Sequence, residues 1–219
     1  MNTLLLRLAG PMQSWGVQSR FSVRDTGLEP SKSGVLGLVC AAMGIPRGDD
    51  DALARLAGLR LGVRTDREGR LSRDYHIALN VLKAGGGIKP SEPSTRYYLA
   101  DAVFLVGLEG NDLSLLEDIH AALNKPVWPL FLGRKAFVPA EPVYLEDGLK
   151  KGAGLVDALC SYPYLGRGER PKHLRLVLED PNGEFFRPDQ PLSFASRRFA
   201  PRRVHVIFTD SLPSYSEVM

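Results

Sequence analysis

The chain has 219 residues, of which 44% are hydrophobic and 24% are charged, and its formal net charge is +3. These are ordinary values for a globular protein, so they exclude a disordered chain, and bulk charge does not indicate nucleic-acid binding. Arginine outnumbers lysine, which suits contacts to phosphates and bases, although a GC-rich genome or thermal adaptation would have the same effect.

Cysteine usage and hydropathy predict where the protein works. Cys40 and Cys160 form no CxxC motif, the N-terminus is typical of a strand rather than a signal peptide, and no apolar stretch is long enough to span a bilayer. We therefore expect a cytoplasmic protein without a membrane segment, with both thiols reduced.

Periodicity and breaker residues predict alternating strands and helices in the first two thirds of the chain. In chain order, the predicted elements are a strand at 2–9, a helix at 34–43, a helix that begins at Asp49, strands at 59–67, 71–82 and 96–108, and a helix at 113–124. This β-α-β-β-α order predicts an α+β fold with a ferredoxin-like or RRM-like sheet. Residues 83–95, which contain Gly85-Gly86-Gly87 and two prolines, predict a mobile connection that orders only against a neighbour.

The pattern changes beyond about residue 145. A short helix at 155–160 is followed by strands at 173–179 and 203–208. We therefore expect a first domain at 1–145 and a small, mostly β C-terminal domain at 146–219.

Two turns carry residues of interest. Gly10-Pro11 ends the first strand and leaves Gln13, Ser14 and Trp15 at a strand end, where functional residues tend to lie. Further on, Lys32 and Ser33 lead into a helix whose free N–H groups would suit an anion, with a plain serine cap as the alternative.

Catalytic and cofactor motifs are few. No Walker A loop, GxGxxG motif or metal-ligand spacing occurs, so we expect no cofactor and no metal. Within the cluster Arg73-Asp74-Tyr75-His76, His76 could act as general acid and base in a metal-independent ribonuclease. A structural pair of Asp74 and His76 is the alternative.

Two regions combine arginine with aromatic residues, a composition that suits single-stranded RNA. The first, 128–135, ends in Gly133-Arg134-Lys135, and the second, 187–203, includes Arg197. Solvated strands with their aromatic rings in the core would have the same composition.

Six segments in a fixed order resemble the CasD subunits of type I-E CRISPR Cascade complexes, which are RAMP proteins. They are residues 6–16, 30–38, 73–76, 96–102, 132–135 and 194–197. The resemblance implies an RRM-like domain with a protruding hairpin thumb at about 73–102, plus a small C-terminal β-domain.

The resemblance also implies a function in antiviral defence. The chain would be a non-catalytic subunit that caps the 5′ handle of crRNA, with the Cascade backbone subunit and large subunit as partners and target DNA as an indirect one. The RNA-binding residues implied are Gln13, Ser14, Trp15, Lys32, Ser33, Arg73, His76, Arg96, Arg134, Lys135 and Arg197. Two alternatives stay open: a type I-C-like endoribonuclease that uses His76, Tyr75 and Lys135 on precursor RNA, and a purely structural scaffold.

Overall fold

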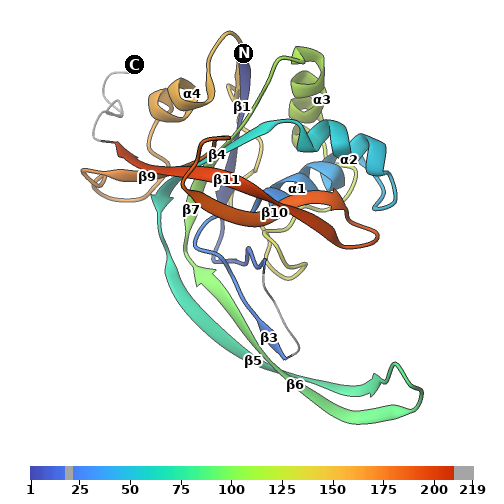
Figure 1. The fold of residues 1–219 in the computed structure, drawn as a ribbon. Coiled ribbons are helices and arrows are strands. Elements are labelled where there is room, and N and C mark those ends of the chain that lie inside the picture. Colours follow the sequence, from blue (N-terminus) through green and yellow to red (C-terminus); the bar gives the residue numbers. More distant parts are fainter. Residues whose placement is uncertain (18–21, 210–219) are drawn as a thin grey trace.

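Seven strands form the main sheet of the computed structural model, which describes residues 1–17 and 22–209. Their order is β10-β11-β9-β4-β7-β1-β8, and all neighbours are antiparallel (Figure 1). These strands are β1 (Asn2–Ala9), β4 (Arg60–Arg67), β7 (Val103–Gly110), β8 (Leu149–Lys150), β9 (Leu174–Glu179), β10 (Phe185–Ser193) and β11 (Arg198–Thr209).

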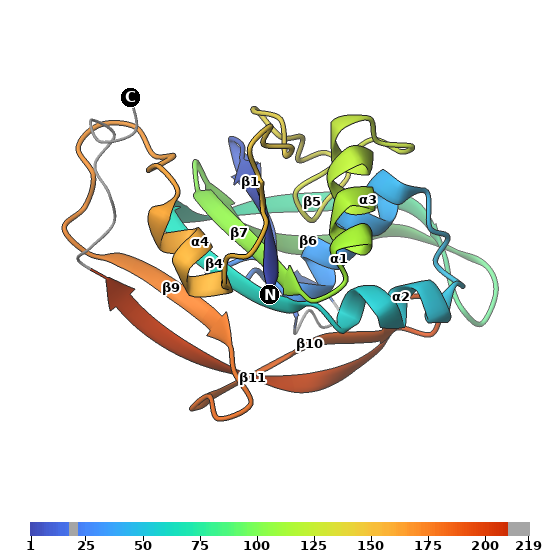
Figure 2. The same cartoon turned by 90° about the horizontal axis from the view of Figure 1, so that it is seen from above.

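Helices cover both faces of this sheet. Figure 2 shows α1, α2 and α3 on one side of β1 and β7, and α4 on the other. The helices are α1 (Lys32–Met43), α2 (Asp50–Ala57), α3 (Leu113–Asn124) and α4 (Leu155–Ser161). Side chains of Ser31, Asp49 and Asp112 cap the first three by accepting a backbone N–H of the first turn. None of the helices in the described ranges is long and apolar enough to cross a membrane.

The alternation of β1 divides the core into two layers. Leu4, Leu6 and Leu8 are fully buried in the larger layer, which also holds side chains of α1, α2 and α3. Leu5 points to the opposite face and packs with Leu105 in the smaller layer under α4. Polar groups on that second face are therefore placed by the same strands that build the core.

A long hairpin, the thumb, extends from the body and curves away from it (Figure 1). It consists of β5 (Arg70–Leu82) and β6 (Ile88–Ala100), which pair without a register shift from Arg70 and Ala100 to Leu82 and Ile88. At the base, β2 (Met12–Gln13) joins β6 antiparallel and β3 (Val23–Arg24) joins it parallel. The base of the thumb is thus anchored by the first thirty residues of the chain.

Two boundaries predicted in this region are wrong. The structureless connection predicted at 83–95 is shorter, because residues 88–95 belong to β6 and pair with β5. Pro93 is tolerated there because its nitrogen faces the same edge of β6 as the Thr95 N–H, which donates to Ser22 O, and that edge is free in the outer thumb. Pro90 faces β5, opposite Asn80, whose φ of 53° interrupts the regular pairing. The strand predicted at 96–108 is two strands, interrupted at Asp101, whose φ is 60°.

The other predicted elements are found close to their expected positions, except that β11 begins at Arg198, five residues before the predicted strand, and the α+β class is confirmed. Strand β10 was not predicted, because Pro188 and Pro191 interrupt its pattern, and the structure places bulges beside both. The order β4-β7-β1-β8 is compatible with a ferredoxin-like arrangement, which stays a prediction. Strands β9, β10 and β11 continue the same sheet beside β4. The predicted division of the chain into two domains near residue 145 also stays a prediction.

Candidate nucleic-acid interface

The turn after β1 is held from inside by two of the predicted site residues. The Gln13 amide donates to the carbonyls of Leu8 (3.2 Å) and Ala102 (2.8 Å), and its oxygen accepts the Trp15 indole N–H at 3.2 Å. Both side chains are buried, with exposed fractions of 0% and 2%. In this structure they shape the turn, and neither reaches the surface where a base would bind.

The N-terminus of α1 already has an anion. The Lys32 backbone N–H donates to the Asp189 carboxylate at 2.7 Å, and that carboxylate is held by Arg202 at 2.7 and 3.0 Å. The Lys32 ammonium is buried and bonds both oxygens of Glu179 at 2.9 Å. Burial lowers the pKa of Lys32, and Glu179 opposes that shift. The anion at this helix end is therefore a side chain of the same protein, which leaves no opening for a phosphate.

The loop after α3 packs against the backbone of the same turn. The Ser14 N–H donates to Leu132 O at 3.1 Å, and Leu132 N–H donates to Phe137 O at 2.7 Å. Gly133 has a φ of 90°, and a Cβ built on it would lie 1.7 Å from the Ser14 carbonyl oxygen. Only glycine permits this approach, which places Arg134 beside the thumb.

Arg134 joins the loop to the base of the thumb. Its Nη2 donates to Tyr97 O of β6 at 2.9 Å, and its guanidinium lies 5.3 Å from the centre of the Phe137 ring. Arg24 of β3 lies directly opposite Arg96 of β6. Together they surround an open hollow of about 350 Å³, the thumb-base hollow, lined by Ser14, Gly16, Arg24, Asp25, Arg96, Gly133 and Arg134.

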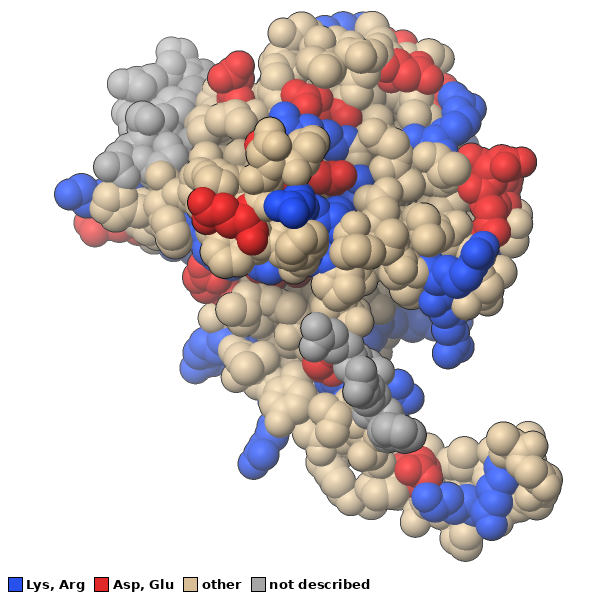
Figure 3. Space-filling view, in the orientation of Figure 1, with Lys and Arg blue, Asp and Glu red and all other residues tan. Residues whose placement is uncertain are grey.

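The electrostatics of the thumb-base hollow favour an anion. Like charges at directly opposed strand positions repel, as Arg24 and Arg96 do here. Burial lowers the pKa of Arg134, and Arg96 and Arg24 lower it further, while Asp74 and Asp25 act in the opposite direction. Three guanidinium groups with incomplete compensation are stabilised by a phosphate, which accepts paired N–H donors. Figure 3 shows that Lys and Arg also occur along the thumb and around its junction with the body.

The structure brings together only part of the predicted site. Ser14, Arg96 and Arg134 line the hollow, and Lys135 is exposed next to it in sequence. Ser33 is half-buried in the first turn of α1, and Arg197 is exposed in the turn between β10 and β11; neither lines the hollow. Arg24 was not predicted as a site residue, because its only signal in the sequence is a cation soon after the Gly10–Gly16 turn.

The predicted catalytic cluster lies on the thumb. Arg73 and Tyr75 point to one face of the hairpin, and Asp74 and His76 to the other. His76 Nε2 contacts the Asp74 carboxylate, and both side chains are about half exposed. Among the described residues, no contact joins His76 to Tyr75 or Lys135, and no group of three or more His, Cys, Asp or Glu could hold a metal ion.

Comparison with known proteins places the chain in a family. The family model described as "CRISPR-associated protein (Cas_Cas5)" matches residues 3–205. The Cascade subunit CasD of Escherichia coli (strain K12) is 32% identical over 223 residues, which cover 93% of this chain and 95% of that protein.

Two solved structures resemble the fold closely. One, described as a Cas protein, is 47% identical with a TM-score of 0.79 and covers 95% of both chains. Another, from a CRISPR RNA-guided surveillance complex, is 35% identical with a TM-score of 0.76 and covers 95% of this chain and 90% of its own. The resemblance found in the sequence is therefore confirmed, and the chain belongs to the CRISPR-associated Cas_Cas5 protein family.

Proposed function

We propose that the chain is a non-catalytic, RNA-binding subunit of a CRISPR surveillance complex of the type I-E Cascade kind, and that it caps the 5′ handle of the crRNA. The observation that carries this proposal is the convergence of Arg24, Arg96 and Arg134 on one open hollow. The relatives named as a Cascade subunit and as part of an RNA-guided surveillance complex support the same assignment.

The three arginines have different roles in the thumb-base hollow. Arg134 is fixed by Tyr97 O and serves as a preplaced cation at the floor. Arg24 is exposed and Arg96 is half-buried, so both can turn toward a phosphodiester backbone. Phosphate contacts supply affinity and register on the strand, and bases splayed from the backbone would supply specificity.

The experiment reconstitutes the complex with Arg24→Gln and Arg96→Gln, singly and together, and measures crRNA affinity over a range of salt concentrations. Each substitution removes a phosphate contact, so we expect about tenfold weaker binding. The slope of log K against log salt should become shallower by about 0.7 per lost contact on a single strand. Arg47→Gln is the matched control, since Arg47 is exposed in the connection between α1 and α2.

Equal affinity and an unchanged salt slope in the double variant would contradict RNA capping and favour a structural scaffold. Loss of affinity in Arg47→Gln as well would show that bulk charge, and not the hollow, is responsible.

The thumb offers a surface for a neighbouring subunit of the same complex. Tyr75, Ile77 and Leu79 lie on one face of β5 and are 64%, 55% and 72% exposed. The opposite face carries His76 and Glu92. An apolar face on a ribbon that extends from the body is typical of a protein contact. We assign it to the backbone subunit that continues along the crRNA.

A ribonuclease remains the second candidate because the exposed pair of His76 and Asp74 could move a proton. Purified protein is incubated with repeat RNA in EDTA, beside His76→Ala. We expect no specific cleavage by either protein. Specific cleavage that is lost in His76→Ala would overturn the non-catalytic assignment.

A further inference from the structure

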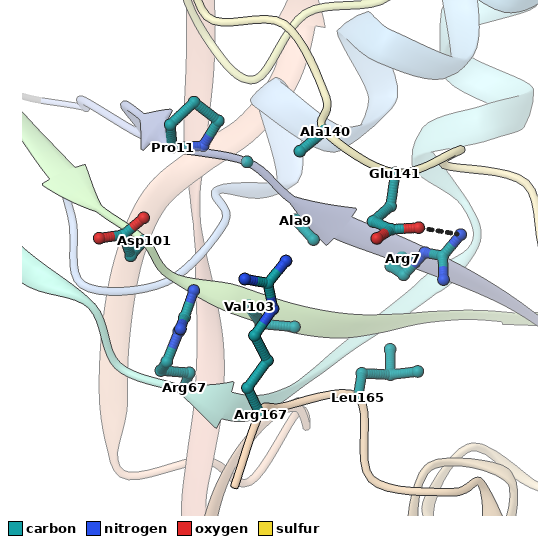
Figure 4. Close-up of a pocket in the computed structure, with 11 residues that line it drawn as sticks. Arg7, Ala9, Pro11, Arg67, Asp101, Val103, Ala140, Glu141, Leu165 and Arg167 are labelled. Carbon is teal, nitrogen blue, oxygen red and sulfur yellow. Dashed lines mark ion pairs between the residues drawn. The ribbon is translucent and has the colours of Figure 1, made fainter.

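A second hollow opens at the end of the main sheet, on the face that carries α4. It measures about 350 Å³ and shares no lining residue with the thumb-base hollow. Three arginines from distant segments surround it: Arg7 of β1, Arg67 of β4 and Arg167 of the loop before β9 (Figure 4). We call it the sheet-end hollow.

Sheet register explains why Arg7 and Arg67 meet. Arg7 pairs with Leu105, which belongs to the core layer under α4, so Arg7 faces that side. The pairing of β4 with β7 shifts between Thr65 and Arg67, so that Arg67 lies opposite Val103. This bulge turns Arg67 to the same face as Arg7.

The arginines of the sheet-end hollow differ in their hydrogen-bond and ion-pair partners. Arg7 donates to Pro142 O at 3.1 Å and pairs with Glu141 at 3.5 Å, so it is fixed by the protein. Within the part of the chain that the structure describes, Arg67 Nε is buried and has no hydrogen-bond partner. A buried donor left unpaired costs free energy that an incoming acceptor would recover. Figure 4 shows Arg67 and Arg167 extending into the hollow from neighbouring segments.

The other lining residues could contact apolar and hydroxyl groups of a ligand as well as an anion. Ala9, Val103 and Leu165 give the hollow an apolar side. Asp101 also lines the hollow, and its backbone N–H donates to Pro11 O at 3.1 Å. Its carboxylate could not bind a phosphate, but it can accept a hydrogen bond from a hydroxyl. The volume lies within the range of small-molecule sites.

We propose that the sheet-end hollow binds one ribonucleotide unit. Its phosphate lies on Arg67 and Arg167, a ribose hydroxyl donates to Asp101, and the base or sugar rests on Ala9, Val103 and Leu165. This site is independent of the guide-binding role given to the thumb-base hollow, because the two share no side chain.

The experiment measures binding of adenosine 5′-monophosphate, its 2′-deoxy analogue, inorganic phosphate and a five-nucleotide single-stranded RNA by calorimetry. The variants are Arg67→Gln, Arg167→Gln and Asp101→Asn, with Arg47→Gln as the charge-matched control. Asparagine tolerates the positive φ of Asp101, and Arg167 lies in an exposed loop, so these two variants should retain the fold.

We expect Arg67→Gln and Arg167→Gln each to weaken nucleotide binding about tenfold, and Arg47→Gln to leave it unchanged. Asp101→Asn should reduce the preference for the ribonucleotide over the deoxyribonucleotide. If only the RNA loses affinity in these variants, the ribonucleotide bound in the hollow is part of a strand. If the mononucleotide loses affinity too, the hollow also binds free nucleotide. Both results support the site.

The proposal is overturned if no probe binds at millimolar concentration. It is equally overturned if Arg67→Gln and Arg167→Gln bind every probe as tightly as the unsubstituted protein. Arg96→Gln separates the two sites. Its effect on guide retention tests the thumb-base hollow. If the sheet-end hollow is independent, Arg67→Gln and Arg167→Gln should weaken nucleotide binding to the same extent with and without Arg96→Gln.

Discussion

Gly133 stands where any side chain would collide with the backbone that it supports. Replacing it with alanine places Cβ 1.7 Å from Ser14 O and also strains a φ of 90°. We expect Gly133→Ala to lower the free energy of unfolding by about 3 kcal/mol or more, measured by urea denaturation. Because the loop must retreat, Arg134 should also lose its contact with Tyr97, and guide binding should weaken.

Gly152→Ala is the matched control for that prediction. Gly152 has a φ of 74°, but nothing lies within 4 Å of its added Cβ. It should therefore cost only the conformational strain, about 1 kcal/mol. Equal losses in the two variants would show that the approach of Gly133 to Ser14 is not what stabilises the loop.

Lys32 and Lys135 should have different roles, although the sequence prediction assigned both to phosphate. The Lys32 ammonium is buried against Glu179, so Lys32→Met leaves that carboxylate with only the Leu61 N–H and the more distant Arg202, and should cost about 3 kcal/mol of stability. The salt slope of crRNA binding should not change. Lys135→Met should leave stability within about 0.5 kcal/mol, because Lys135 is exposed, and should weaken crRNA binding. The reverse pattern would restore Lys32 as a phosphate ligand.

At the scale of elements, the register of the thumb decides how it can be shortened. Ala78 lies opposite Glu92, so removing residues 79–91 and inserting an Asn-Gly turn keeps every remaining pair in register. Deleting 85–93 alone would leave the end of β5 unpaired. The thermal midpoint of the symmetric deletion should stay within a few degrees, because the removed side chains of Leu79, Leu82 and Ile88 are exposed. Assembly with the other Cascade subunits should be impaired.

Single substitutions separate the face of the thumb from its length. Ile77→Lys introduces a charge on the apolar face and should impair assembly, while Ala78→Lys does the same on the opposite face and should not. Unfolding of the isolated protein by the symmetric deletion would show that the outer thumb belongs to the core. Equal assembly defects in the two lysine variants would contradict the assigned face.

At the scale of the whole molecule, a buried ionic network joins the last strands to the first helix. Lys32 contacts Glu179 of β9 and Asp189 of β10, and Arg202 of β11 binds Asp189. Since these strands also continue the main sheet beside β4, we expect one cooperative unfolding transition. Tryptophan fluorescence and hydrogen exchange of β9 to β11 should then have the same urea midpoint. Complete exchange of β10 and β11 while the tryptophan signal is native would establish a separate C-terminal domain.

Most of the local structure, and membership of the family, could be predicted from the sequence. Strand β1 and helix α3 have their predicted bounds, because alternation, helical spacing and caps act over a few neighbouring residues. The six ordered segments were enough to identify CasD-like proteins, since motif order is a property of the chain alone.

Which cations are available to a ligand depends on the tertiary structure. Lys32 and Arg134 both follow turns and look alike in sequence, yet Asp189 and Glu179, about 150 residues away, occupy the first. The bulge before Arg67 likewise depends on pairing with β7. Whether a cation is exposed depends on the side chains that distant strands place against it. The pattern of hydrophobic and polar residues along one strand does not predict those partners.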